Sequence, residues 1–246
     1  MSFREEFVEN GYIVKRSLLN EHEVIELQEN VDRFIKKVIP NVPNEEVYYD
    51  DVDRPETLKQ IQHLSKYDRY FKELALNSKV LGLAEECLGA PVDLINVQYF
   101  NKSPEKNLCT PPHQDGFYFP IQPQEALTMW LSLDDADVEN GAVRYIPKSH
   151  NRGLREHHRS QILGFSQSIK DWSEEDEESL LQMEAKAGDI LVHHSLTIHA
   201  SKPNVSTRVR RAVGFIFYRS DVVCDEKAHA LYQKNLAKGL ALEGKL

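Results

Sequence analysis

Apolar residues early in the chain recur every three or four positions, the spacing of one helix face. The stripe is formed by Val24, Leu27, Val31, Phe34 and Ile35. Asn20 is a typical N-cap residue, Glu23 stands where a capping box needs it, and Pro40 marks the helix end. A second apolar stripe lies between Asn77 and Gly89. The first 90 residues are therefore predicted to be mostly helical and to support a sheet.

From residue 91 the pattern changes to short apolar runs separated by turn residues, which is typical of β-strands. The runs cover residues 94–100, 126–133, 142–146, 190–194 and 211–218. Asn140-Gly141 and Gly188-Asp189 are predicted tight turns, because glycine adopts a positive φ without steric strain. The pattern predicts a mainly β fold with flanking helices, arranged as an antiparallel barrel or sandwich.

Chain length and local composition set the expected organisation. A chain of 246 residues fits a single domain, 1–246. We expect a helical buttress (1–90), a β core (91–220) with a polar excursion over the barrel mouth (151–186), and a C-terminal helix (221–246).

Net charge and cysteine content exclude several classes of protein. A formal net charge of -9 argues against a nucleic-acid partner, because phosphate binding needs clustered Lys and Arg. Cys87, Cys109 and Cys224 are an odd number without a CxxC pair, so neither a disulfide framework nor a zinc site is indicated. No apolar run suits a signal peptide or a membrane span. We expect a cytoplasmic protein with no membrane partner.

Candidate metal ligands occur at two places in the β region. His113 and Asp115 are two positions apart, so both project from the same face of an extended chain. His199 lies 86 positions downstream, and a barrel can bring it beside the first pair. Two histidines and one carboxylate leave coordination positions open on a metal ion that they hold. This arrangement suits iron(II) that binds a bidentate cosubstrate and oxygen. By itself, one His-x-Asp pair among ten histidines is a weak signal.

A cluster of arginines strengthens this signal. Arg208, Arg210 and Arg211 open an otherwise apolar strand shortly after His199. A guanidinium directed into a barrel interior needs an anion, and a carboxylate binds it bidentately. An inward arginine is therefore expected to bind the distal carboxylate of a dicarboxylate cosubstrate, while at least one of the three faces solvent. The alternative is a basic patch on the surface.

The order and spacing of several motifs resemble the phytanoyl-CoA dioxygenase family between about Gln98 and Tyr218. The motifs are His113-Gln114-Asp115, Tyr118-Phe119-Pro120, Trp130, Glu139-Asn140-Gly141, Ile146-Pro147-Lys148-Ser149-His150, His199-Ala200-Ser201 and Arg210. The resemblance implies a double-stranded β-helix (jelly-roll, cupin-like) barrel. It also implies iron(II), 2-oxoglutarate and O2, and an enzyme that hydroxylates an unactivated carbon of a small molecule with release of succinate and CO2.

Carried over to this chain, the resemblance makes His113, Asp115 and His199 the iron ligands. It makes Arg210, 11 positions after His199, the anchor of the far carboxylate of 2-oxoglutarate. Ser201 corresponds to a hydroxyl beside that carboxylate.

Further residues match the walls of the pocket. Gln98 and Trp130 correspond to family positions that line the cosubstrate site, although Trp130 fits ordinary core packing equally well. Tyr118, Phe119 and the excursion at 151–186 are the candidates for the substrate wall.

Asp115 bears on the type of reaction. Related enzymes that halogenate lack this carboxylate, so hydroxylation or desaturation is expected here. The alternative function is a metal-binding jelly roll without oxygenase activity, acting as an isomerase, a hydrolase or a sensor. The sequence leaves the substrate and the oligomeric state open.

The remaining chemistry-bearing residues receive structural interpretations. His193 and His194 face opposite ways on a strand and neither has ligand spacing, so they are expected to support the ligands or to lie at the surface. Asp134, Asp135 and Asp137 are interpreted as a solvated turn, because no calcium-loop spacing accompanies them.

Overall fold

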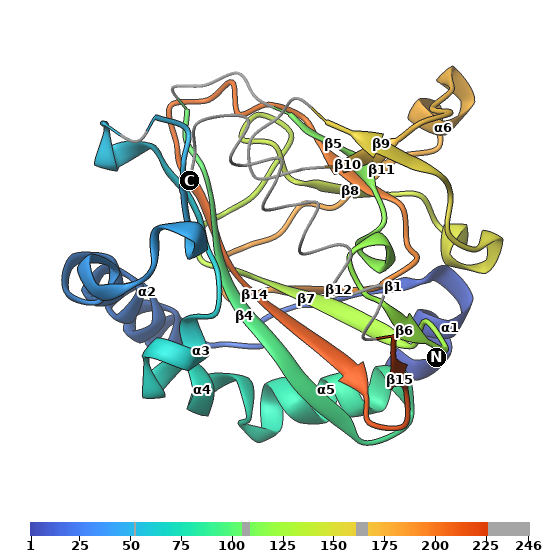
Figure 1. Cartoon of the computed structure of the whole chain (residues 1–246), viewed down its shortest axis with the longest axis horizontal. Coiled ribbons are helices and arrows are strands. Elements are labelled where there is room, and N and C mark those ends of the chain that lie inside the picture. The colour runs from blue at the N-terminus through green and yellow to red at the C-terminus, as the bar shows by residue number, and fades with distance from the viewer. Residues whose placement is uncertain (52, 105–108, 161–166, 226–246) are drawn as a thin grey trace.

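A large antiparallel sheet, a smaller sheet and a layer of helices on the outer side of the large sheet make up the structure (Figure 1). This computed structural model describes residues 1–51, 53–104, 109–160 and 167–225. The helices are α1 (Phe3–Asn10), α2 (Glu21–Lys37), α3 (Leu64–Tyr67), α4 (Arg69–Ala75), α5 (Ser78–Leu88) and α6 (Glu174–Glu178). Short 3-10 turns occupy Ile39–Asn41, Asn44–Glu46, Pro55–Thr57, Asp115–Phe117 and Ser149–Arg152. Within these ranges, none of the helices combines the length and apolarity needed to cross a bilayer.

Seven strands form the large sheet, in the order β1-β12-β7-β14-β4-β3-β2. Their bounds are β1 (Tyr12–Lys15), β12 (Ile190–His194), β7 (Ala126–Ser132), β14 (Arg210–Arg219), β4 (Val92–Lys102), β3 (Leu58–Ile61) and β2 (Val47–Tyr49). The smaller sheet contains β11 (Leu181–Gln182), β8 (Val143–Tyr145), β13 (His199–Ser201) and β5 (Thr110–His113), in that order. Two further pairs join β9 (His157–Arg159) to β10 (Gln167–Ile169) and β6 (Ile121–Gln122) to β15 (Val223–Cys224). These two sheets form the double-stranded β-helix that was expected.

Alternate residues of the central strands face opposite sides of the large sheet. On β14, Val213, Phe215 and Phe217 are fully buried in the main core, which includes Leu27 and Phe34 of α2. The intervening positions of the same strand face the inside of the barrel. Because both faces are covered, β7 is buried along its whole length, which explains its nearly continuous apolar sequence.

The helix and strand signals in the sequence correspond closely to observed elements. Helix α2 begins with the predicted capping box, in which Asn20 and Glu23 each accept the other's backbone N–H. Helix α5 is capped by Asn77 and ends at Gly89, which has a φ of 65°. The run at 190–194 matches β12, and 211–218 lies within β14. Gly141 and Gly188 both adopt the expected positive φ.

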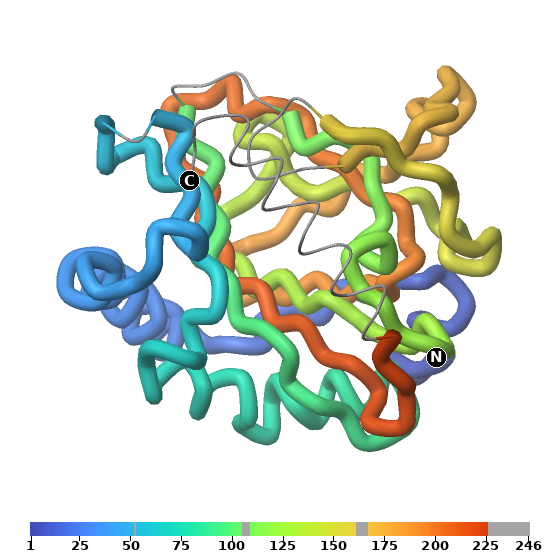
Figure 2. The backbone as a smooth tube through the Cα atoms, in the orientation of Figure 1, coloured from blue at the N-terminus to red at the C-terminus, as the bar shows by residue number. Residues whose placement is uncertain are grey.

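Several short strands had no clear signal in the sequence. In the first 90 residues, β1, β2 and β3 join the large sheet, so this region contributes to the barrel as well as to its helical support. Figure 2 shows the blue N-terminal segment beside the orange β12, with which β1 pairs. The helix predicted for 221–246 is wrong at its start, where β15 forms because Val223 and Cys224 pair with Gln122 and Ile121. The rest of that prediction, from 226 on, lies outside the described residues.

Candidate metal centre

His113, Asp115 and His199 come together inside the barrel. His113 ends β5 and His199 begins β13, and the register places these two residues directly opposite each other. Asp115 begins the 3-10 turn after β5. The Nε2 atoms of both histidines are 3.6 Å from Asp115 Oδ1, and one ligand atom from each residue lies within 4.8 Å of the others. Ligands about 2.1 Å from one metal ion lie at roughly this separation, so the three atoms fit a shared ion.

Backbone hydrogen bonds orient both imidazoles. His113 Nδ1 is 2.8 Å from the carbonyl of Pro111, and His199 Nδ1 is 3.0 Å from the carbonyl of Thr197. Since a carbonyl only accepts, each Nδ1 carries the proton and each Nε2 presents a lone pair toward the centre. Burial lowers the pKa of both imidazoles, and for His199 the neighbouring imidazoles lower it further. Both rings are therefore neutral at physiological pH, the state that binds a metal.

The second oxygen of Asp115 is held by two donors. Thr128 Oγ1 donates to Asp115 Oδ2 at 2.6 Å, and His193 Nε2 lies 3.1 Å from the same oxygen. Tyr145 completes the chain, with its hydroxyl 2.8 Å from His193 Nδ1. Burial alone would raise the pKa of Asp115, but the His199 and His193 rings outweigh it and lower that pKa. Oδ2 is thus occupied by protein donors, and Oδ1 remains for a metal.

The two adjacent histidines of β12 have different surroundings, as their alternation predicts. His193 points into the barrel and supports Asp115. His194 lies on the other face, 6.0 Å from the ring of Phe7, and accepts the backbone N–H of Leu196. The sequence pattern left open which of the two faces inward. His157, in the excursion, is half-buried against this region and accepts the backbone N–H of Gln114 at 3.1 Å.

Arg210 is the arginine of the cluster that enters the barrel. Its side chain is buried, Nη1 donates to the carbonyl of Gly141 at 2.7 Å, and Cζ lies 5.0 Å from the ring centroid of Trp130. Nε is buried without a hydrogen-bond partner, and no carboxylate in the described part of the chain pairs with this guanidinium. Burial lowers the pKa of Arg210 to about 10. A buried cation in this condition fits an anionic ligand.

The other two arginines face outward and pair with the acidic turn. Arg211 binds Asp134 through Nε and Nη2 at 2.9 and 2.8 Å. Arg208 pairs with Asp137 at 2.7 Å. The acidic cluster is therefore a set of ion pairs at a turn, and its carboxylates face cations of the protein itself.

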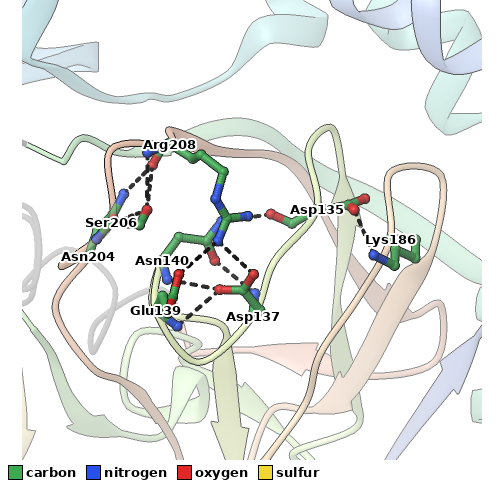
Figure 3. Close-up of polar contacts among 8 residues, drawn as sticks. All are labelled: Asp135, Asp137, Glu139, Asn140, Lys186, Asn204, Ser206 and Arg208. Carbon is green, nitrogen blue, oxygen red and sulfur yellow. Dashed lines mark hydrogen bonds and ion pairs between the residues drawn. The ribbon is translucent and has the colours of Figure 1, made fainter.

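Figure 3 shows how this turn is fixed. Asn140 accepts from the backbone N–H of Asp137 at 2.8 Å and donates to the carbonyl of Asp135 at 2.7 Å. Asp135 also pairs with Lys186 at 2.7 Å. The next residue is Gly141, whose carbonyl receives Arg210. The network thus sets the position of that acceptor.

Lys102 is a buried lysine that the sequence interpretation missed. It lies opposite Arg210 in the β4–β14 register, and its Nζ donates to Ser201 Oγ at 2.6 Å and to the carbonyl of Lys202 at 2.7 Å. Burial, followed by the nearby guanidinium of Arg210, lowers the pKa of Lys102 well below its usual value. The available signal was strand alternation, which places residues 98, 100 and 102 on one face.

Gln98 and Trp130 lie in one row across the large sheet. Both flank Gly214, which pairs with Gln98 on one side and Trp130 on the other. A Cβ on Gly214 would approach the ring of Phe100 to 2.7 Å, so the bare backbone leaves room for aromatic side chains at this level of the barrel. The ring of Trp130 is accordingly directed to Arg210 as well as to the core.

Comparison with known proteins agrees with this geometry. The family model described as "Phytanoyl-CoA dioxygenase (PhyH)" matches residues 7–212. A "Probable alpha-ketoglutarate-dependent hypophosphite dioxygenase" of Stutzerimonas stutzeri is 27% identical over 214 residues, covering 85% of this chain and 74% of that protein. The peroxisomal phytanoyl-CoA dioxygenase of Bos taurus is 25% identical over 230 residues, covering 87% and 67%.

Solved structures show the same architecture. EvdO2 from Micromonospora carbonacea var. aurantiaca matches with a TM-score of 0.72 at 25% identity, covering 90% of this chain and 91% of that one. The epimerase SnoN, crystallised with Fe3+, alpha ketoglutarate and nogalamycin RO, matches with a TM-score of 0.73 at 20% identity, covering 90% and 84%. The similarity to SnoN shows a shared fold alone. From the family match and the His-Asp-His site, the chain belongs to the phytanoyl-CoA dioxygenase family, as an iron(II)- and 2-oxoglutarate-dependent dioxygenase.

Proposed function

We propose that this enzyme hydroxylates an unactivated carbon of a small-molecule substrate, consuming O2 and 2-oxoglutarate and releasing succinate and CO2. In this proposal the chain works as one domain, and His113, Asp115 and His199 hold the iron. One oxygen atom of O2 enters the substrate C–H bond as a hydroxyl group, and the other enters succinate.

The observation that carries the proposal is the buried guanidinium of Arg210, which pairs with no carboxylate among the residues that the structure describes and lies close to the metal centre. Trp130, which stacks on Arg210, is two residues from Thr128, which holds Asp115. Alternate residues of a strand are about 7 Å apart, a span that a five-carbon dicarboxylate can bridge. A ligand with a keto-acid end for the metal and a second carboxylate for Arg210 satisfies both features. Without such a ligand, the buried cation would be costly.

The residues of the chain supply positioning and charge. When bound, iron(II) and 2-oxoglutarate supply the oxidising chemistry. Arg210 pairs with the distal carboxylate, and Ser201, held by Lys102, is placed to donate to it. Gln98 and Trp130 line the same space. Hydrogen bonds from Thr128 and His193 orient the carboxylate of Asp115.

The substrate is expected to enter past an apolar wall beside the metal ligands. Phe119 packs with Ile216 and Tyr218, and the ring of Tyr118 lies 6.5 Å from that of His113. These side chains limit the access of water to the reacting carbon. The excursion at 151–186 contributes through His157, whose ring centroid lies 4.7 Å from that of Phe117 in the turn after His113.

The compartment is also a proposal. Among the described residues all three cysteines are free, with Cys109 and Cys224 exposed. Exposed thiols are typical of a reducing compartment, which supports a cytoplasmic location.

Anaerobic reconstitution with iron(II) and 2-oxoglutarate tests the proposal. We expect a visible metal-to-ligand charge-transfer band that His199→Ala abolishes. His158→Ala, an exposed histidine, is the matched control and should keep the band. In air, the wild type should release succinate from 2-oxoglutarate and convert a suitable substrate to an alcohol. Absence of the band from wild-type protein would contradict the proposal, and an olefin product would replace hydroxylation by desaturation.

A further inference from the structure

Three side-chain amides form a fixed cluster on the inner face of the large sheet. Asn96 Nδ2 and Gln98 Nε2 both donate to Gln62 Oε1, each at 3.2 Å. The backbone N–H of His63 donates to Asn96 Oδ1 at 2.9 Å. Asn96 and Gln98 are buried, whereas Gln62 is half-buried. None of these hydrogen bonds involves His113, Asp115 or His199.

The hydrogen bonds fix the direction of every amide in the cluster. A backbone N–H can only donate, so the atom of Asn96 that faces His63 must be the oxygen. Its NH2 group then faces Gln62, which must present its own oxygen. The NH2 group of Gln62 is consequently turned away from the cluster. This orientation follows from one backbone group and does not depend on the choice between amide flips.

Two polar atoms of the cluster have no protein partner within the described ranges. They are Gln62 Nε2 and Gln98 Oε1, and neither is among the fully buried unpartnered atoms, so both are accessible. One is a donor and the other an acceptor. Together they match a neutral group that accepts one hydrogen bond and donates another, such as a carboxamide or a hydroxyl.

The cluster lies across the barrel from the metal ligands. Asn96 pairs with Ile216, and Ile216 pairs with Thr128, so the three residues form one row. Adjacent strands are about 4.8 Å apart, which puts Asn96 about 10 Å from Thr128, the donor to Asp115. Ile216, in the middle of the row, packs with Phe119 of the proposed substrate wall. A small molecule can thus contact the amides while its apolar part crosses Ile216 toward the metal.

Charge around the cluster is balanced. The backbone N–H of Gln62 donates to the backbone carbonyl of Glu46. The side chain of Glu46 pairs with Lys66 at 3.2 Å. Burial lowers the pKa of His63, which keeps its ring neutral at physiological pH. A carboxylate or an ammonium group would lose its hydration here without gaining an ion pair. The surroundings favour a neutral polar group.

We propose that Gln62 and Gln98, oriented by Asn96, bind a neutral carboxamide or hydroxyl group of the substrate and so place its oxidised carbon at the metal. This inference rests on the proposed function and names the substrate class for the same site. Gln62 supplies the donor, Gln98 the acceptor, and Asn96 transmits the orientation set by His63. Recognition by amides selects neutral substrates against charged ones of equal size.

The test compares three sets of small molecules of matched size. The first contains neutral carboxamides and alcohols, the second carboxylates and the third alkylammonium ions. Each is assayed for stimulation of succinate release over the rate without substrate, and active compounds are titrated anaerobically by calorimetry into the iron(II)–2-oxoglutarate enzyme. Neutral compounds are expected to stimulate and to bind.

Variants at position 62 assign the effect to the cluster. Gln62→Glu replaces the donor by an anion, and Gln62→Met removes hydrogen bonding at similar volume. Each should weaken binding of the neutral compound about tenfold or more, and should lower 2-oxoglutarate affinity by a smaller factor, which acts through the contact between Gln62 and Gln98. Gln28→Glu is the control, because Gln28 donates to the carbonyl of Leu133 outside the barrel.

Outcomes of this experiment separate the two proposals. If wild-type enzyme shows the charge-transfer band but only carboxylates or ammonium ions stimulate, or no neutral compound does, the substrate class is wrong and the proposed function stands. Equal effects of Gln62→Met and Gln28→Glu would also overturn the role of the cluster. Absence of the band would instead count against the proposed function.

Discussion

The guanidinium of Arg210 lies over the indole ring of Trp130, with Cζ 5.0 Å from the ring centroid. This contact fixes the direction of a buried cation whose side chain makes one hydrogen bond within the described part of the chain, to the carbonyl of Gly141. Trp130→Leu should weaken 2-oxoglutarate binding about tenfold, because a desolvated cation–π contact contributes up to about 2 kcal/mol. Trp130→Phe should have a smaller effect. Anaerobic titration of 2-oxoglutarate measures both, and wild-type affinity in the leucine variant would show that the indole only fills space.

The hydrogen bond from His193 to Asp115 predicts an effect on metal affinity. His193→Leu leaves Asp115 Oδ2 with Thr128 as its remaining donor, so the carboxylate is less well oriented. Iron(II) affinity should fall about 10- to 100-fold, the usual range for a residue that supports a ligand. Tyr145 is one hydrogen bond further from the metal ligands, so Tyr145→Phe should lower the iron(II) affinity less. Competition with a metal chelator measures the affinities, and an effect of Tyr145→Phe larger than that of His193→Leu would reverse this order.

Substitution of Gly141 is expected to lower both the stability of the fold and the affinity for 2-oxoglutarate. Its φ is 77°, and an added Cβ would come within 2.4 Å of the carbonyl of Lys202. Gly141→Ala should therefore destabilise the fold by about 1–3 kcal/mol and displace the carbonyl that Arg210 binds. Gly82→Ala is the control, since its Cβ meets nothing within 4 Å and alanine favours helix α5 by about 1 kcal/mol. Urea unfolding measures both. Equal stability of the two variants would be inconsistent with strain at Gly141.

His194 predicts part of the acid sensitivity of the fold. Burial, with smaller contributions from His150 and His193, lowers the pKa of His194 to about 4, whereas in the unfolded chain it is about 6.5. Between these values the unfolded state binds more protons, so stability falls as pH decreases through this window. The loss attributable to this residue is about 2 kcal/mol at pH 5.

The variant His194→Asn isolates this contribution. Asparagine keeps an acceptor for the Leu196 N–H but does not titrate. The stability difference between pH 7 and pH 5, from urea unfolding, should be smaller in the variant by about 2 kcal/mol. The same pH dependence in both proteins would mean that His194 is solvated in the folded state.

The sequence was sufficient to predict that His113, Asp115 and His199 would come together, because their residue types and spacing are both unusual. His113 and Asp115 share one local face, and strand periodicity then indicated a barrel that could bring in His199. Strands such as β7 were predictable because continuous apolar runs occur where both faces of a sheet are covered. Short strands such as β1 were missed, since four residues that include Lys15 give no clear period.

Contacts that depend on register were beyond the sequence. The alternation of side chains along a strand predicts that His193 and His194 face opposite sides. The pairing of β12 with β7 then shows that His193 is the one beside Asp115. A buried lysine such as Lys102 contradicts the usual exposure of this residue type, so composition argued against it. The amide contact between Gln62 and Asn96 joins residues 34 positions apart that carry no motif.

The most direct test of the central claim is the discrimination between 2-oxoglutarate and 2-oxobutanoate, which keeps the keto-acid end but lacks the distal carboxylate. Anaerobic titrations of the iron(II) enzyme should show that the wild type binds 2-oxoglutarate at least about 100-fold more tightly, since a buried charge pair contributes several kcal/mol. Arg210→Leu should lose most of this preference while retaining iron(II), and Arg208→Leu, whose side chain pairs with Asp137 at the surface, should keep it. Equal discrimination by wild type and Arg210→Leu would contradict the account.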